Sequence, residues 1–95
     1  MQPEKQRFMA FIPNIHFTAL IKIEGRLKEF NFRKRAEDVY DADTADDRGN
    51  RWQFKWKKGP EGWEIVSLTP TLPTWIANNK AIIEEAFMKQ PEVNG

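Results

Sequence analysis

Residues 51–68, RWQFKWKKGPEGWEIVSL, show the clearest alternation of apolar and polar residues in the chain. Over the first seven residues, aromatic residues alternate with polar or basic ones. This alternation is typical of a β-strand with one aromatic and one mostly basic face. Gly59, Pro60 and Gly62 follow, and they predict a tight turn because Gly adopts positive φ and Pro fixes φ. Residues 63–68 then return as a second strand. This stretch predicts a β-hairpin around which the fold is organised.

Three segments before this hairpin also have strand character. Apolar residues alternate with polar ones from Ile15 to Glu24, and Glu24-Gly25 predicts a hairpin turn. The segment that follows places Phe30 and Phe32 on one face. We interpret residues 33–38 as a solvated connection and residues 46–50 as a polar turn into the central hairpin. The three predicted strands are 15–24, 27–33 and 39–45.

The residues after the hairpin change from strand to helix period. Two prolines within residues 69–73 prevent a central strand from continuing. Thr74 is a good helix N-cap, and the apolar residues from Trp75 to Phe87 fall on one helical arc. Asn79 lies within that arc. Either the helix breaks there, with Asn78 or Asn79 capping a second segment, or Asn79 finds a partner at the sheet.

The pattern as a whole predicts a single α+β domain over residues 1–95. An antiparallel meander of four to five strands packs its aromatic side against one C-terminal helix. Residues 1–13 fit either a short N-terminal helix or a mobile segment, and residues 90–95 are expected to fray. The sequence therefore predicts the order and the layers of the fold.

Composition excludes several classes of protein. The chain has 95 residues, a net charge of +1 and no cysteine. Disulfide frameworks, thiol catalysis and Cys-based metal sites are therefore excluded, and no strong global field attracts nucleic acid or membranes. No run approaches the roughly 20 apolar residues that cross a bilayer, and the N-terminus does not resemble a signal peptide. We expect a cytoplasmic protein with no membrane partner.

Motifs for catalysis or cofactors are weak. The acidic run of residues 41–47 lacks the spacing of a calcium loop, because Ala45 stands where an oxygen ligand is needed. His16 is the only histidine and Ser67 the only serine, and neither lies at a strand-to-helix elbow that would expose a nucleophile. The glycines form no phosphate-binding loop. We expect no enzyme activity, no cofactor and no metal.

A basic strand face is one candidate binding surface. Successive cations on one side of a strand lie about 6.6 Å apart, close to the phosphate spacing of an extended single strand. The strand order, with Ser67-Leu68-Thr69-Pro70 leading toward a Trp-containing helix, also resembles the PUR family of single-stranded nucleic-acid binders, although Thr71-Leu72-Pro73 is an insertion. The alternative is that these cations only solvate the sheet. The residues of this predicted basic face are Arg51, Gln53, Lys55, Lys57 and Lys58, with Arg33, Lys34 and Arg35 of the earlier turn as an optional extension.

An aromatic sheet face is the other candidate. A helix of about 16 residues covers only about 24 Å of a sheet, so four tryptophans in one small domain could leave aromatic surface uncovered. The alternative is that all four tryptophans are core or half-buried. We expect a non-catalytic binding domain that engages a protein partner or forms a homodimer through this face, with single-stranded nucleic acid as the less favoured ligand. The residues of this predicted aromatic interface are Trp52, Phe54, Trp56 and Trp63.

Overall fold

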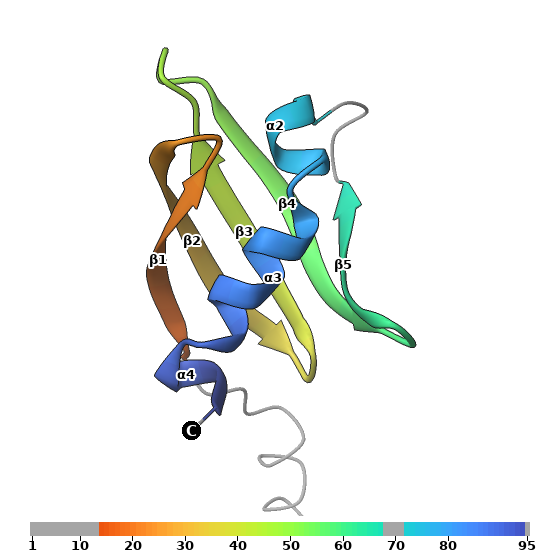
Figure 1. Cartoon of the computed structure of the whole chain (residues 1–95). Coiled ribbons are helices and arrows are strands. Elements are labelled where there is room, and N and C mark those ends of the chain that lie inside the picture. The colour runs from red at the N-terminus through yellow and green to blue at the C-terminus, as the bar shows by residue number, and fades with distance from the viewer. Residues whose placement is uncertain (1–13, 68–71, 95) are drawn as a thin grey trace, which may run out of the picture.

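The computed structural model describes residues 14–67 and 72–94 (Figure 1). It is a five-stranded antiparallel meander in the order β1-β2-β3-β4-β5, followed by short helices, which confirms the predicted α+β class. The strands are β1 (His16–Ile23), β2 (Arg26–Ala36), β3 (Val39–Ala45), β4 (Arg51–Gly59) and β5 (Gly62–Ser67). The helices are α2 (Thr74–Ala77), α3 (Lys80–Met88) and α4 (Pro91–Asn94).

Short turns fix the register of the sheet. Glu24 and Gly25 both have positive φ, 51° and 83°, as a two-residue hairpin turn requires. The predicted central hairpin is confirmed as β4 and β5, which pair out to Gly59 opposite Gly62. Leu68, predicted as its last residue, lies outside the described residues, as does the predicted N-terminal helix in residues 1–13. Each strand thus pairs with its neighbours in the sequence.

The second strand is longer than its pattern predicts. Residues 34–36, expected in a connection, belong to β2, and the connection shrinks to Glu37 and Asp38. A register shift between Lys34 and Ala36 marks a β-bulge at Arg35. Arg35 lies on the same face as Arg33, which pairs with Asp41 in the register, and Arg35 forms an ion pair with Asp41 that holds this end of β2 against β3.

The predicted single helix is divided into two, α2 and α3. Pro73, and not Thr74, occupies the N-cap of α2, so the predicted start was wrong by one residue. Asn79 separates α2 from α3, and its side-chain Nδ2 donates to the Trp75 carbonyl at 2.8 Å and to Glu24 Oε2 at 3.3 Å. The helix therefore breaks at Asn79, which occupies the N-cap position of α3 without a side-chain cap hydrogen bond, and its side chain finds a partner in the β1–β2 turn. The tail that was expected to fray contains α4, whose Val93 packs against the core.

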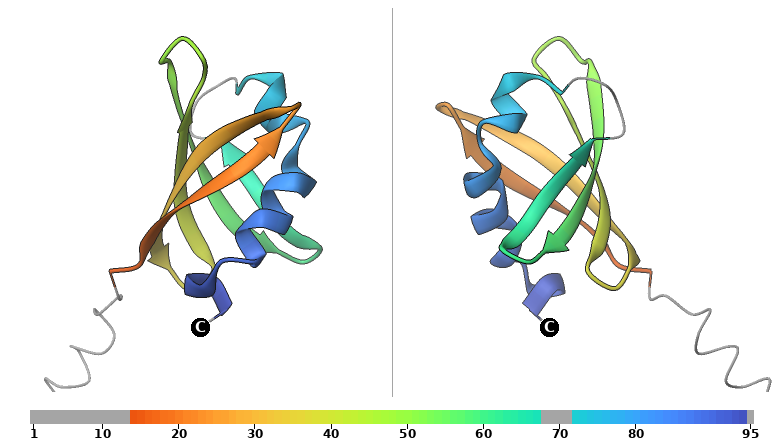
Figure 2. Two further views of the ribbon diagram at one scale, coloured as in Figure 1. Left: turned by 60° about the vertical axis from the view of Figure 1, so that its left-hand side comes forward. Right: turned by 90° about the vertical axis from the view of Figure 1, so that its right-hand side faces the viewer.

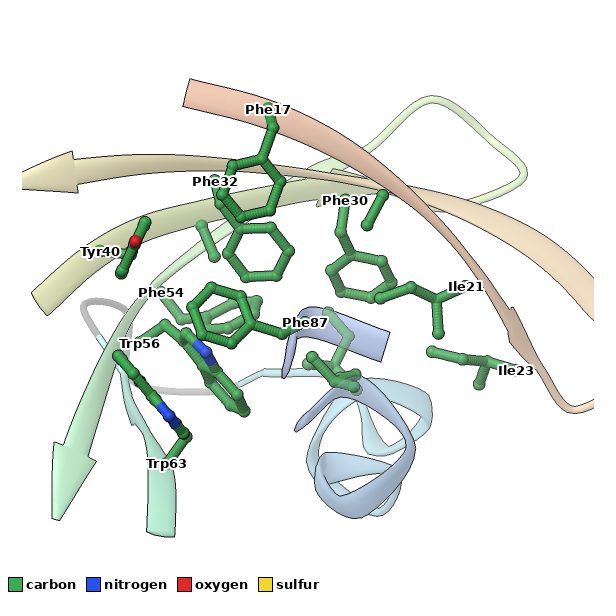
Figure 3. Close-up of a cluster of buried hydrophobic side chains, with 14 residues drawn as sticks. Phe17, Ile21, Ile23, Phe30, Phe32, Tyr40, Phe54, Trp56, Trp63 and Phe87 are labelled. Atoms are coloured by element: carbon green, nitrogen blue, oxygen red, sulfur yellow. The ribbon is translucent and has the colours of Figure 1, made fainter. Parts of the chain in front are cut away.

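Helix α3 lies across the inner side of the curled sheet, between its two edge strands (Figures 1 and 2). Phe87 connects those edges: its ring centroid lies 6.0 Å from Phe17 in β1 and 4.7 Å from Trp63 in β5. Figure 3 shows the ring surrounded by aromatic side chains of the sheet. The predicted core, between the aromatic side of the sheet and the helix, is confirmed.

Among the described residues of the core, the hydroxyl of Thr44 has a hydrogen-bond partner, whereas Nε1 of the buried Trp56 has none. Thr44 is fully buried, and its hydroxyl donates to the Glu29 carbonyl at 2.8 Å. A buried hydroxyl without such a partner would cost about 1–3 kcal/mol. Across residues 14–67 and 72–94, none of the helices has the length and hydrophobicity needed to span a membrane.

Candidate binding surface on the outer face of the sheet

The residues of the predicted aromatic interface lie on the inner face, under the helices. Phe54 and Trp56 are completely buried, Trp63 is 6% exposed, and Trp52 is half-buried against the same core. The rings of Trp56 and Trp63 stack with centroids 6.0 Å apart, and Phe87 covers both. A partner could reach these rings only if α3 moved away. With Trp75 also half-buried, all four tryptophans are core or half-buried, as the second interpretation expected.

The predicted basic face is divided between the two sides of the sheet. Arg51, Gln53, Lys55 and Lys57 alternate with the buried rings of β4 and so lie on the outer face. Lys58 stands opposite Trp63, which places it on the inner side at the end of the strand. The structure therefore brings four of the five predicted residues onto one surface.

A ladder of hydrogen bonds crosses this outer face from β1 to β4. The strand register aligns Thr18, Asn31, Asp43 and Gln53 in one row. The Thr18 hydroxyl donates to Asn31 Oδ1 at 2.6 Å, and Asn31 Nδ2 donates to Asp43 Oδ1 at 3.0 Å. Arg51 donates to the same Asp43 oxygen. These hydrogen bonds therefore hold each of the side chains that they connect in a defined position.

A second row is centred on Asp41. Arg35 Nε donates to Asp41 Oδ2 at 2.5 Å, and Lys55 Nζ lies 3.4 Å from the other carboxylate oxygen. Burial by itself would raise the pKa of Asp41, but the hydrogen bonds and charges of Arg35 and Lys55 lower it below the ordinary value. Asp41 is thus ionised at neutral pH and balances part of the charge of its two neighbours.

These two rows line an open hollow of about 490 Å³ on the outer face. Three arginines contribute to it, Arg33, Arg35 and Arg51, against the carboxylates of Asp41 and Asp43. Arg35 and Arg51 are paired with these carboxylates, whereas Arg33 forms no ion pair with any described residue. His16 lies directly opposite Arg33 in the register. The hollow therefore combines a fixed polar frame with unbalanced positive charge.

The sequence prediction missed the contribution of the first three strands to this surface. It named Arg33, Lys34 and Arg35 only as an extension of the β4 face and did not include Thr18, Asn31, Asp41 or Asp43, because the alternation in β4 is the strongest. A two-residue turn at Glu24-Gly25 does place Thr18 opposite Asn31, since residues at equal distances from a hairpin turn face each other. The position of Arg35 beside Asp41 requires β2 to continue past Arg33, and the basic run gives no clear signal for that continuation.

The acidic run of residues 41–47 is divided by the fold. Asp41 and Asp43 face the hollow, while Asp46 accepts the backbone N–H groups of Arg48 and Asn50 within its own turn. Asp47 pairs with Arg26 at 2.6 Å and Lys28 at 2.8 Å, which ties this turn to β2. Within the described part of the chain, no three acidic or histidine side chains gather around a common point that could hold a metal ion.

Comparisons of the chain with protein-family models, with curated proteins and with solved structures each found no match.

Proposed function

We propose that this chain is a non-catalytic protein-binding domain that docks an acidic segment of a partner protein on the outer face of its sheet. The observation that carries the proposal is the hollow, which is lined by three arginines and by side chains that form interstrand hydrogen bonds with each other. Arg is enriched at protein interfaces because its planar group forms several directed hydrogen bonds. We further propose a cytoplasmic location, which rests on the absence of cysteine.

The fixed positions of the side chains support binding. Ordering a long side chain at an interface costs about 0.5–1.5 kcal/mol. Arg35 and Arg51 are already held by Asp41 and Asp43, so part of this cost is met before a ligand arrives. Arg33 then supplies a guanidinium that has no acidic partner among the described residues. A carboxylate placed beside it would gain a charge-assisted hydrogen bond.

The two central carboxylates favour a peptide over a nucleic acid. A nucleic-acid strand carries a continuous row of phosphates, and that row would have to pass over Asp41 and Asp43. A peptide can place single carboxylates beside the arginines and neutral or basic groups beside the aspartates. Arg51 and Lys55, central to the nucleic-acid prediction, already have aspartate partners.

The test is a titration with three labelled probes followed by fluorescence anisotropy. The probes are a glutamate-rich peptide, a glutamine-rich peptide of the same length and oligothymidylate. We expect the glutamate peptide to bind best. Arg33→Gln should weaken its binding about 10-fold or more, the value of one lost hydrogen bond to a charged group. Lys89→Gln is the control, because Lys89 is an exposed cation on the helical side.

Other outcomes discriminate between the proposals. Tight binding of oligothymidylate with a steep loss of affinity as salt rises would overturn the peptide proposal and support nucleic-acid binding instead. Equal binding of the glutamate peptide by Arg33→Gln and wild type would show that the hollow is not the site. If none of the probes binds at low salt, the acidic-segment proposal is wrong.

A further inference from the structure

The two edges of the sheet differ in how their backbone groups are satisfied. At the β5 edge, the Trp63 N–H donates to Glu84 Oε2 at 3.2 Å, and its carbonyl accepts from Lys80 Nζ at 2.7 Å. Lys80 and Glu84 lie on α3 and form an ion pair of 3.1 Å with each other. The helix thus occupies the hydrogen-bonding groups that a further strand would need beside Trp63.

The β1 edge has no such cover among the described residues. The carbonyl of Ile15 accepts the Lys34 N–H at 2.9 Å, so Ile15 faces β2. Backbone groups alternate in direction along an antiparallel strand. The next residues to direct their N–H and carbonyl groups away from β2 are therefore His16, Thr18, Leu20 and Lys22. None of these groups is bonded to a described residue, and no described element passes over β1 in the left view of Figure 2.

Strand β1 also lacks the features that protect an edge from pairing. Edges are usually blocked by proline, bulges, several charges or short length. Strand β1 has eight residues in regular register with β2, no proline, and Lys22 as its only Lys, Arg, Asp or Glu. Leu20 is 65% exposed, and Leu27, opposite Lys22 on the same face, is 67% exposed. An uncovered apolar spot therefore adjoins the open edge.

We propose that β1 pairs antiparallel with β1 of a second copy of this chain and joins the two sheets across a two-fold axis. With Ala19 opposite the partner's Ala19, each outward-facing residue of β1 finds a hydrogen-bonding partner in the other copy. Leu20 then lies opposite the partner's Thr18 and loses much of its exposure. This dimer differs from one formed through the aromatic face, because no buried ring is uncovered.

The occupant is a second copy because the strand is complementary to itself. In a contact with two-fold symmetry, each pair of residues across the interface occurs twice, with the two copies exchanged. An antiparallel pairing centred on Ala19 has this symmetry. Ala19 would sit at a pair without hydrogen bonds, where the two Cα atoms approach to about 4.5 Å. A small side chain suits this close approach. The pairing also places the two hollows on one continuous outer face.

The experiment is sedimentation velocity at concentrations from about 1 to 500 μM, a range that brackets dimers of micromolar affinity. Wild type should reach twice the 11.2 kDa mass of one chain. Leu20→Pro removes an outward N–H that has no described partner, so the monomer keeps its fold while the dimer weakens at least about 10-fold. Leu20→Thr is the matched control, because it also loses the leucine but retains the N–H.

A second variant keeps the test decisive if Leu20→Pro fails to fold. Leu20→Lys retains the backbone and places like charges near the two-fold axis, so it should also be a monomer. A wild-type chain that stays monomeric throughout, or a dimer unchanged in folded Leu20→Pro or Leu20→Lys, would overturn the proposal. Leu20 does not line the hollow, so binding of the glutamate-rich peptide should be unchanged in Leu20→Pro and Leu20→Thr, which add no charge, whatever their mass.

Discussion

At the scale of single residues, Phe87 joins α3 to the whole width of the sheet. Its ring contacts five other aromatic rings, one from each of the five strands. Aromatic pairs of this kind contribute about 0.5–1.5 kcal/mol each beyond the area they bury. The ring also supplies the contact through which α3 reaches both edge strands. The rings in contact with Phe87 are Phe17, Phe32, Tyr40, Trp56 and Trp63.

Phe87→Ala should therefore be among the most destabilising single substitutions. The variant loses the transfer free energy of the ring and leaves a cavity, so we expect a loss of about 3–5 kcal/mol in the free energy of unfolding. Urea denaturation followed by tryptophan fluorescence measures it. Met88→Ala is the control, because Met88 is the next residue of the helix and is exposed, and it should change stability by less than about 0.5 kcal/mol. Equal losses in both would contradict this account of the core.

At the scale of elements, strands were easier to predict than their ends. The central hairpin and β3 follow from alternation and turn residues, and β3 has the predicted bounds Val39–Ala45. The end of β2 was missed because a run of basic residues looks the same in a strand as in a loop. Only the ion pair between Arg35 and Asp41, which belongs to the tertiary structure, distinguishes the two.

The helical break shows a similar limit. The sequence identified Asn79 as the weak point of the predicted helix, but it could not decide between a cap and a contact with the sheet. In the structure Asn79 occupies the N-cap position of α3, but its side chain makes no cap hydrogen bond there and reaches Glu24 in the β1–β2 turn. The candidate site was predicted only in part. Its β4 residues have a local signal, whereas Arg33 and Asn31 join them through the register.

The contact between α3 and β5 predicts a dependence of stability on pH. Hydrogen bonds from Lys80 and from the Trp63 N–H lower the pKa of Glu84 below its ordinary value. A lowered folded pKa stabilises the protein above the unfolded pKa of about 4.3, and this contribution is lost as pH falls through the folded value. Glu84→Gln should therefore be less stable than wild type at pH 7, and the difference should shrink toward pH 3.

The matched control for this prediction lies one residue further along the helix. Glu85 is 70% exposed and forms only a surface ion pair of 3.6 Å with Lys89. Urea midpoints of Glu85→Gln should follow wild type at every pH. A difference between Glu84→Gln and wild type that stays constant from pH 7 to pH 3 would show that the carboxylate charge is not what stabilises the edge.

At the scale of the whole molecule, the helices are the second layer without which the sheet exposes its aromatic face. A chain that ends at residue 67 loses every contact made by α3, including the cover of Trp56 and Trp63. We expect this truncated chain to lose cooperative unfolding and to bind the dye ANS, as proteins with exposed apolar surface do. A chain that ends at residue 90 lacks only α4 and should still unfold cooperatively. Cooperative unfolding of the shorter chain would contradict the two-layer account.

The position of the helices after the sheet in the chain has a consequence for synthesis. A ribosome adds about 5–20 residues per second, so about one to four seconds pass between the completion of β5 and that of α3. Until α3 has also left the ribosome, the strands that have emerged can form hairpins but have nothing to cover their rings. The same face that is closed to partners in the finished protein is then open to chaperones and to neighbouring nascent chains. Slower translation beyond residue 67 should therefore favour aggregation of the newborn chain.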